Sequence, residues 1–243
     1  MASQSILDIV RAVTGRIGLE RPGSATGSSD NQVQQLVALA NEEGQELADR
    51  YPWQALIREK TFTTVAAESQ GLLVGGTILT PADGFKYIVN DTVWDRSMQY
   101  QLQASSPARW QADKGFTTVG PYARFRIRAG VLLLNPAPGA GQSLAFEYMS
   151  DNWVSNQAGD TFSPAFTQDA DYPLLDSRLI AAGLLWRWKA AKGLEYAEDY
   201  NKYERMVLDA TVRDGSKSAV SMNGPDNATF GPYVVVPSGN WNQ

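Results

Sequence analysis

The chain has 243 residues and a formal net charge of −5, and its sequence contains neither cysteine nor histidine. The lack of cysteine excludes disulfide bonds, thiolate metal sites and cysteine nucleophiles, and it is typical of a protein that folds inside a cell. The lack of histidine removes the commonest general base and the commonest zinc ligand, which leaves carboxylate, lysine, tyrosine or oxygen-ligated metal chemistry. We therefore expect a protein that is not an enzyme and that binds no cofactor.

The charge pattern limits the possible partners. Lysine and arginine are scattered along an acidic chain, whereas a protein that wraps nucleic acid clusters them on one surface. An acidic protein can still line a passage through which DNA slides. No window reaches the roughly 18 apolar residues of a membrane span, and Asp8 interrupts the apolar N-terminal segment. We expect no membrane contact and no signal peptide.

Residues 1–52 are predicted to form two helices. Apolar residues at helical spacing predict the first over residues 5–17, and a loop rich in glycine and serine follows it. Ser29 or Asp30 is expected to cap the second helix, which ends at Pro52.

The second helix carries an acidic run that consists of Glu42, Glu43 and Glu46. Three carboxylates so close together could ligate a metal ion. We interpret them as a solvent-exposed helix face, because runs of charge on a helix are usually solvated.

The sequence pattern changes at Trp53, where alternating and short apolar runs separated by turns replace the helical period. Residues 53–165 are therefore predicted to form an inserted antiparallel β domain. Its candidate strands are 56–66, 72–74, 85–90, 122–128, 131–134 and 143–149. A short helix over 106–114 is expected to interrupt them, with Pro107 at its first position.

One candidate strand alternates strictly between charged and apolar residues. Arg124, Arg126 and Arg128 point one way, and Phe125 and Ile127 point the other. The arginines either form an ordinary solvent-exposed face or a basic stripe that lies on an oligomer interface or faces a channel.

Residues 166–215 are predicted to form two further helices, separated at Gly193, with Asp171 and Pro173 marking the start of the first. Asp169, Asp171 and Asp176 suggest a calcium loop, but the segment lacks the necessary glycine and terminal glutamate. We interpret these aspartates as helix-capping residues.

The first of these two helices has two apolar stripes on different faces. One stripe consists of Leu175, Leu179, Gly183, Trp186 and Ala190, and the other of Ile180, Leu184, Trp188 and Ala191. One face can pack on the protein's own core, and we assign the other to another subunit or another protein. The next helix bears a tyrosine stripe, which we interpret as core or interface because a nucleic-acid stacking platform also needs a basic groove. The predicted subunit interface comprises Trp186, Trp188, Tyr196, Tyr200 and Tyr203.

Residues 216–243 carry little charge, no helical period and several glycines and prolines, so they cannot fold alone. Such a segment is either disordered or an extended arm that docks on a neighbour, for example by adding a strand to a sheet edge. Its aromatic residues favour the arm. The predicted docking residues are Phe230, Tyr233, Val234, Val235, Val236 and Trp241.

The order of elements predicts an α+β fold. N- and C-terminal helix pairs are expected to form an antiparallel helical bundle, with the β domain inserted between the pairs and the arm at the end. Three passages show a resemblance to a known family: Leu39–Thr64, Leu79–Asp95 and Trp186–Glu204. The second also has a proline, an acidic residue and an aromatic residue in order, at Pro81, Asp83 and Phe85. Together they resemble the head-to-tail adaptor proteins of tailed bacteriophages, particularly of short-tailed phages.

This resemblance implies a structural virion protein at the head-tail junction, made in the host cytoplasm. In that family, copies of a mostly helical protein form a ring, usually of twelve, under the portal protein. The ring extends the DNA channel and is a platform for the tail nozzle or tail tube protein. The family's C-terminal segment commonly reaches the portal, which would give residues 216–243 a role. This chain differs from the smallest adaptors of the family in having a larger β insertion.

Two other interpretations remain. Seven tryptophans, ten tyrosines and the carboxylates of Asp91 and Asp95 could serve a carbohydrate-binding or carbohydrate-cleaving tail module. Solvation is the simpler explanation of those two carboxylates. The chain could also be a monomeric helical scaffold with a disordered tail.

Overall fold

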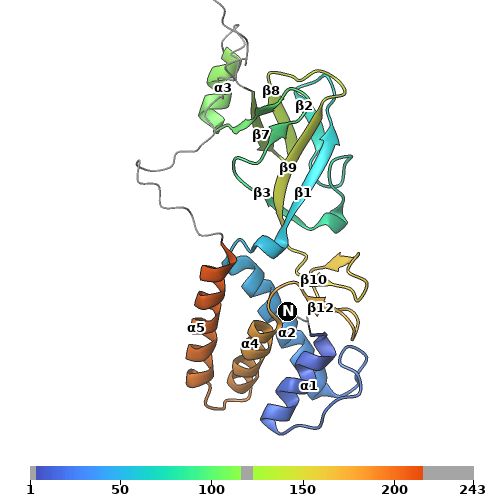
Figure 1. Ribbon diagram of the computed structural model, residues 1–243, viewed down its shortest axis with the longest axis vertical. Helices are drawn as coiled ribbons and strands as arrows, with labels where there is room; N and C mark the ends of the chain where they lie inside the picture. Colours follow the sequence, from blue (N-terminus) through green and yellow to red (C-terminus); the bar gives the residue numbers. More distant parts are fainter. Residues whose placement is uncertain (1–3, 116–122, 216–243) are drawn as a thin grey trace, which may run out of the picture.

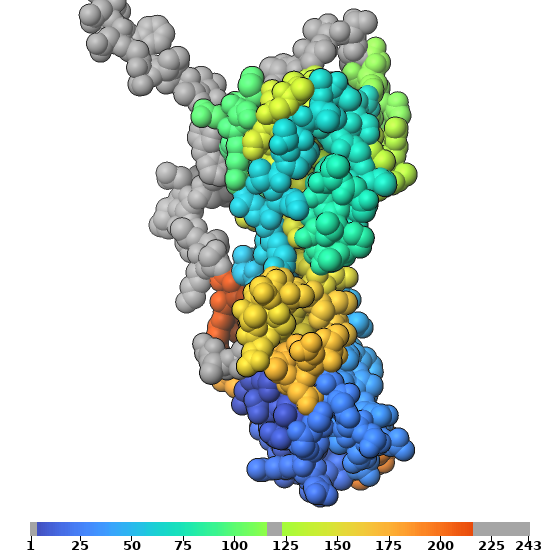
Figure 2. Space-filling view, turned by 90° about the vertical axis from the view of Figure 1, so that its right-hand side faces the viewer, coloured from blue at the N-terminus to red at the C-terminus, as the bar shows by residue number. Residues whose placement is uncertain are grey.

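The computed structural model describes residues 4–115 and 123–215, and these residues form a mixed α+β fold. Figure 1 shows an elongated molecule with α1, α2, α4 and α5 at one end and most of the β-strands at the other. The space-filling view in Figure 2 shows the same two parts one above the other. The predicted α+β class is therefore confirmed.

The two N-terminal helices begin and end close to the predicted positions. Helix α1 (Ile6–Ile17) is capped by the Ser5 side chain, and Gly18 ends it in the left-handed conformation with φ 75°. Helix α2 (Asn31–Arg50) is capped by Asp30, whose carboxylate accepts a hydrogen bond from the Gln32 N–H.

The C-terminal helices are α4 (Ser177–Ala191) and α5 (Ala197–Asp214), and Gly193 lies between them as predicted. The predicted start of α4 at Asp171 and Pro173 is wrong, because Asp176 is the cap. Asp171 instead accepts hydrogen bonds from the backbone of Thr167 and Gln168, which closes a turn before the helix.

Helix α4 lies at the centre of the helical part and contacts α1, α2 and α5. Its buried side chains join a hydrophobic core that these helices share. Two glycines permit the closest approaches in this core. A Cβ atom on Gly44 would lie 2.1 Å from the Trp153 ring, and one on Gly183 would lie 2.1 Å from the Glu43 carboxyl carbon.

The first sheet is built around one long central strand. That strand is β9 (Ser143–Ser150), whose residues from Ser143 to Met149 pair with the whole of β1 (Ile57–Thr63). On its other side it pairs with β3 (Phe85–Ile88) and β4 (Trp94–Asp95), and β4 pairs in turn with β5 (Tyr100–Gln101). All of these pairings are antiparallel.

A second sheet packs against the first. Its strands lie in the order β2 (Ser69–Leu72), β8 (Val131–Asn135), β7 (Arg124–Arg128) and β6 (Gln103–Ala104). The β6 and β7 strands are parallel, and the other pairs are antiparallel. A second hydrophobic core, with Phe125 and Leu132 from this sheet and Phe146 and Tyr148 from the first, fills the space between the two sheets.

Short elements complete the β part. Two 3-10 helices, η1 (Gln54–Leu56) and η2 (Pro81–Asp83), precede β1 and β3. Helix α3 (Pro107–Gly115) lies close to the predicted position, and the Ser106 hydroxyl accepts a hydrogen bond from the Arg109 N–H. The predicted strand at 72–74 is displaced, because β2 ends at Leu72 and Val74 forms only an isolated bridge with Leu79.

A small third sheet lies beside the helices. It consists of β11 (Phe162–Ser163), β10 (Val154–Ser155) and β12 (Tyr172–Pro173). Trp153, Val154 and Phe166 around this sheet belong to the helical core, although most of the segment lies within the predicted β insertion. Asn41 of α2 holds the segment in place by accepting a hydrogen bond from the Phe166 N–H.

Several contacts join the helical part to the β part, and two of them involve charged side chains of β3 and β1. Lys86 of β3 forms an ion pair with Asp49 of α2, and the Arg58 guanidinium lies 3.6 Å from the ring centroid of Phe162. Met149, near the end of β9, belongs to the helical core. The long β1–β9 pair therefore extends from one core to the other.

Candidate functional site

The predicted docking residues at Phe230, Tyr233, Val234, Val235, Val236 and Trp241 lie outside the described residues. The arm therefore stays a prediction. The other predicted residues lie on α4, α5 and β7.

The structure brings four of the five predicted interface residues together in one aromatic cluster. The Trp186 ring lies with its centroid 6.3 Å from that of Tyr196, 5.1 Å from that of Tyr200 and 6.2 Å from that of Tyr203. Trp188 is not part of this cluster, and Lys192 lies over its ring. The cluster holds α5 against α4.

Burial divides four of these five residues into two kinds, and the fifth, Trp186, is half-buried. Tyr203 is 1% exposed and Trp188 is 8% exposed, so both are core residues of this chain, and their assignment to a subunit interface is corrected. Tyr196 is 43% exposed and Tyr200 is 39% exposed, so both offer surface to a neighbour. The two apolar stripes of α4 need no second subunit, because α1, α2 and α5 of the same chain pack around that helix.

The interpretation of the acidic run on α2 as a solvent-exposed face is corrected as well. Arg187 of α4 binds all three carboxylates, with its Nε 2.6 Å from Glu43 Oε2, its Nη1 2.7 Å from Glu42 Oε1 and its Nη2 against Glu46. Glu43 is fully buried, so this part of the run is not a solvated helix face. The run instead holds α4 to α2.

Burial raises the pKa values of two groups near the Arg187–Glu43 ion pair. Desolvation raises the pKa of the Glu43 carboxyl, although the Arg187 hydrogen bond and charge act in the opposite direction. Desolvation also raises the pKa of the Tyr203 hydroxyl, and the nearby Glu43 charge adds to the effect. Glu43 and Tyr203 are 0% and 1% exposed, so both groups are buried among the helices.

Within residues 4–115 and 123–215, no group of three or more acidic side chains is arranged to hold a metal ion. Of the three aspartates that suggested a calcium loop, Asp176 alone caps a helix, so the capping interpretation is wrong for Asp169 and Asp171. Asp176 caps α4 as expected. Asp169 accepts hydrogen bonds from the backbone of Ala25 and Thr26 and so ties the first interhelical loop to the segment before α4. Burial acts to raise the pKa of the Asp169 carboxyl and is the largest single effect. The hydrogen bonds from Ser24, Thr26 and Ala25 together outweigh it, so the pKa lies below its ordinary value.

The three arginines of β7 alternate as predicted. Phe125 is buried in the core between the two sheets, so Arg124, Arg126 and Arg128 lie on the outer face of the second sheet. Arg124 forms an ion pair with Asp113 of α3, with its Nε 3.3 Å from Oδ2. Helix α3 therefore lies on this same face.

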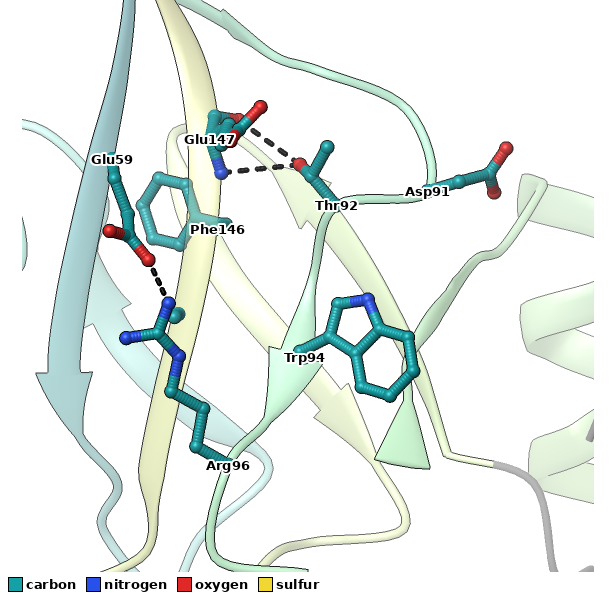
Figure 3. A pocket seen from close by; sticks show the side chains of 8 residues that line it. Glu59, Asp91, Thr92, Trp94, Arg96, Phe146 and Glu147 are labelled. Carbon is teal, nitrogen blue, oxygen red and sulfur yellow. Dashed lines mark hydrogen bonds and ion pairs between the residues drawn. The ribbon is translucent and has the colours of Figure 1, made fainter. Parts of the chain in front are cut away.

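A pocket of about 410 Å³ opens on the outer face of the first sheet (Figure 3). It is lined by Glu59, Asp91, Thr92, Trp94, Arg96, Ala145, Phe146 and Glu147. Glu59 forms an ion pair with Arg96, and the Thr92 hydroxyl accepts a hydrogen bond from the Glu147 N–H at 3.2 Å. In the view of Figure 3, the Trp94 indole lies below Thr92 and to the right of the Arg96 guanidinium.

The strand register explains the pocket. Trp94 is paired with Ala145, and both residues line the pocket. Glu59 is paired directly with Glu147, which places two carboxylates on the same face at the same level. Sequence reasoning missed these residues, although Glu147 is a lone charge within the apolar run of residues 144–149 and so marked an outward-facing position.

The two carboxylates considered for a glycosidase do not line the same pocket. Asp91 lines the pocket, whereas Asp95 is fully buried and accepts hydrogen bonds from the backbone of Ser97 and Met98 at 2.9 Å. The expectation that solvation explains Asp95 is corrected, because this side chain holds the turn that follows β4.

The chain matches no protein-family model, and no curated protein is significantly similar to it in sequence. No helix among the described residues is long and apolar enough to cross a membrane.

Proposed function

We propose that this protein is a structural subunit of a ring that joins the portal to the tail of a tailed bacteriophage and extends the DNA channel. It performs no chemistry. The observation that carries the proposal is the two-part molecule, in which a helical end and a β end each have their own hydrophobic core. A subunit of this shape can contact the portal with one part and a tail nozzle or tail tube protein with the other.

The passages that resemble the adaptor family lie at informative places in this fold. Leu39–Thr64 runs from α2 through η1 into β1 and so links the two parts. Trp186–Glu204 contains the turn between α4 and α5 together with the aromatic cluster. The family's helical arrangement is also part of the proposal: α1, α2, α4 and α5 form an antiparallel bundle of N- and C-terminal helix pairs, which their mutual contacts support.

The exposed side of α5 supports contact with a neighbouring copy. Leu208 and Val212 are 64% and 68% exposed, and they are four residues apart on one face of the helix. Tyr196 and Tyr200 are exposed nearer the start of the same helix. Exposed apolar side chains grouped on one helix are typical of a protein interface. The arm at 216–243 follows α5 directly, and in this proposal it reaches the portal.

The proposal is tested by sedimentation velocity of the purified protein mixed with the portal ring of its own phage. The protein alone and a mixture with an unrelated phage's portal are the controls. We expect one heavy complex with about one copy of this protein per portal subunit, because a ring of copies sits on a ring of portal subunits. Independent sedimentation of the two proteins at micromolar concentration would overturn the proposal.

A further inference from the structure

The two outer faces of the β part carry opposite charge. A closed ring of more than two copies needs a heterologous contact, in which one surface of each copy meets a different surface of the next. Among the described residues, the outer faces of the two packed sheets offer such a pair. They point away from one another, because the second hydrophobic core lies between the sheets.

The acidic face is the pocket of Figure 3. It has the carboxylates of Glu59, Asp91 and Glu147 and the single guanidinium of Arg96, which gives a net charge of −2. Like charges directly opposite one another across two strands are unfavourable, and here Arg96 neutralises only Glu59 of the Glu59–Glu147 pair. Glu147 and Asp91 are exposed beside the half-buried Trp94 and have no ion-pair partner among residues 4–115 and 123–215.

The basic face is the outer side of the second sheet with helix α3. Arg124 is paired with Asp113 and Lys114 with Glu68, while Arg109 shares Asp113. Within the described part of the chain, Arg126 and Arg128 have no carboxylate partner. The described charges of this face therefore sum to about +3, counting Asp113 and Glu68 against the five cations.

We propose that the acidic pocket of one copy receives Arg126 and Arg128 of the next copy. Glu147 and Asp91 accept charge-assisted hydrogen bonds from the guanidinium groups of these two arginines. The pocket of about 410 Å³ is large enough to admit an arginine head group and part of its stem. This inference rests on the proposed ring and specifies the surfaces through which its copies meet.

The lack of native cysteine allows a direct test by cross-linking. The variant with both Glu147→Cys and Arg126→Cys is mildly oxidised on the portal ring, and the products are separated without reductant. The two positions lie on opposite faces of one copy, so disulfides form only between copies. We expect a ladder of dimers, trimers and higher species, whereas either single-cysteine variant gives at most dimers.

Charge reversal gives the second test. One variant carries Asp91→Arg with Glu147→Arg, and the other carries Arg126→Glu with Arg128→Glu. Each variant has two faces of the same sign, so we expect each alone to assemble at least about tenfold more weakly than the unaltered protein, which corresponds to about 1.4 kcal/mol. An equimolar mixture is expected to recover assembly, because the two kinds of copy can alternate round a ring.

The outcomes separate this inference from the proposed function. A ring on the portal without a ladder, with both charge-reversed variants assembling normally, overturns the inference and leaves the adaptor function standing. If the unaltered protein fails to bind the portal, the proposed adaptor function is wrong. A ladder formed by concentrated protein without the portal would still support the proposed contact between copies. If a soluble oligosaccharide shifts the Trp94 indole N–H signal in NMR while the ladder is absent, the pocket is a sugar site and the inference is wrong.

Discussion

Arg187 of α4 and Glu43 of α2 form an ion pair inside the helical core, with the arginine Nε 2.6 Å from Oε2. The carboxylate is fully buried and rests against Gly183, where an added Cβ atom would lie 2.1 Å from the Glu43 carboxyl carbon. A buried pair of this kind gains little over apolar side chains of similar size, but loss of one partner leaves an uncompensated charge. The pair therefore sets how α2 and α4 pack and makes that packing sensitive to single substitutions.

Arg187→Met removes the positive partner and leaves Glu43 buried alone. We expect a loss of about 3 to 5 kcal/mol in the free energy of unfolding, measured by urea denaturation. Glu42→Gln is the matched control, because the Glu42 side chain is 60% exposed and its contact with Arg187 is at the surface. That control should change stability by no more than about 1 kcal/mol. Equal losses in the two variants would show that burial of Glu43 does not determine the effect.

The Arg50–Glu204 pair should make stability depend on pH. Its two hydrogen bonds, at 2.8 and 2.7 Å, lower the pKa of the Glu204 carboxyl in the folded protein below its ordinary value of 4.5. The folded state therefore binds fewer protons here than the unfolded state, and the stabilisation is complete above pH 4.5. It is lost as the pH falls through the lowered folded-state pKa.

Glu204→Gln tests this dependence. Relative to the variant, the unaltered protein should be more stable at neutral pH, and the difference should shrink progressively below pH 4.5, the ordinary value. The measurement is urea denaturation over a series of pH values. Asp209→Asn, an exposed change on the same helix, serves as the control for loss of a negative charge. A difference that stays constant down to pH 2, or one that the control reproduces, contradicts the assignment.

Two helical glycines make a matched pair for a steric prediction. In Gly44→Ala the new Cβ would lie 2.1 Å from the Trp153 ring, so the indole must move, and we expect a loss of about 1 to 3 kcal/mol. In Gly15→Ala of α1 the new Cβ meets only the Arg21 side chain at 3.5 Å, an ordinary contact. Here we expect a gain of about 0.4 to 1 kcal/mol, because alanine loses less backbone freedom on folding. Thermal and urea unfolding of both variants would check the opposite signs.

The sequence predicted the α+β class and the positions of all the main helices, because apolar periodicity and caps such as Asp30 are local signals. It did not predict the strands of two residues, such as β4 and β10, since these exist only through pairing with distant segments. The start of α4 was misplaced for a related reason, because Asp171 and Asp176 are both plausible caps and only the fold decides between them.

The candidate site was harder to predict than the fold. Sequence periodicity showed that α4 is apolar on two faces, but it could not show that α5 and α2 of the same chain cover both. The burial of Glu43 was hidden as well, because its partner Arg187 lies 144 residues further along the chain. Trp94 and Glu147 come together only through the register of β9 with its neighbours, which a single sequence does not encode locally.

Deletion of residues 217–243 tests the arm. Both hydrophobic cores and the described contacts between the two parts lie within residues 4–115 and 123–215, so we expect the truncated protein to keep its unfolding free energy within about 0.5 kcal/mol. We expect it to lose binding to the portal in sedimentation velocity, because the arm contains the aromatic docking residues. A full-length variant with Tyr233→Ser and Trp241→Ser separates loss of those side chains from loss of the segment. A truncated protein that bound the portal with full affinity would show that α5 or the β part makes the contact instead.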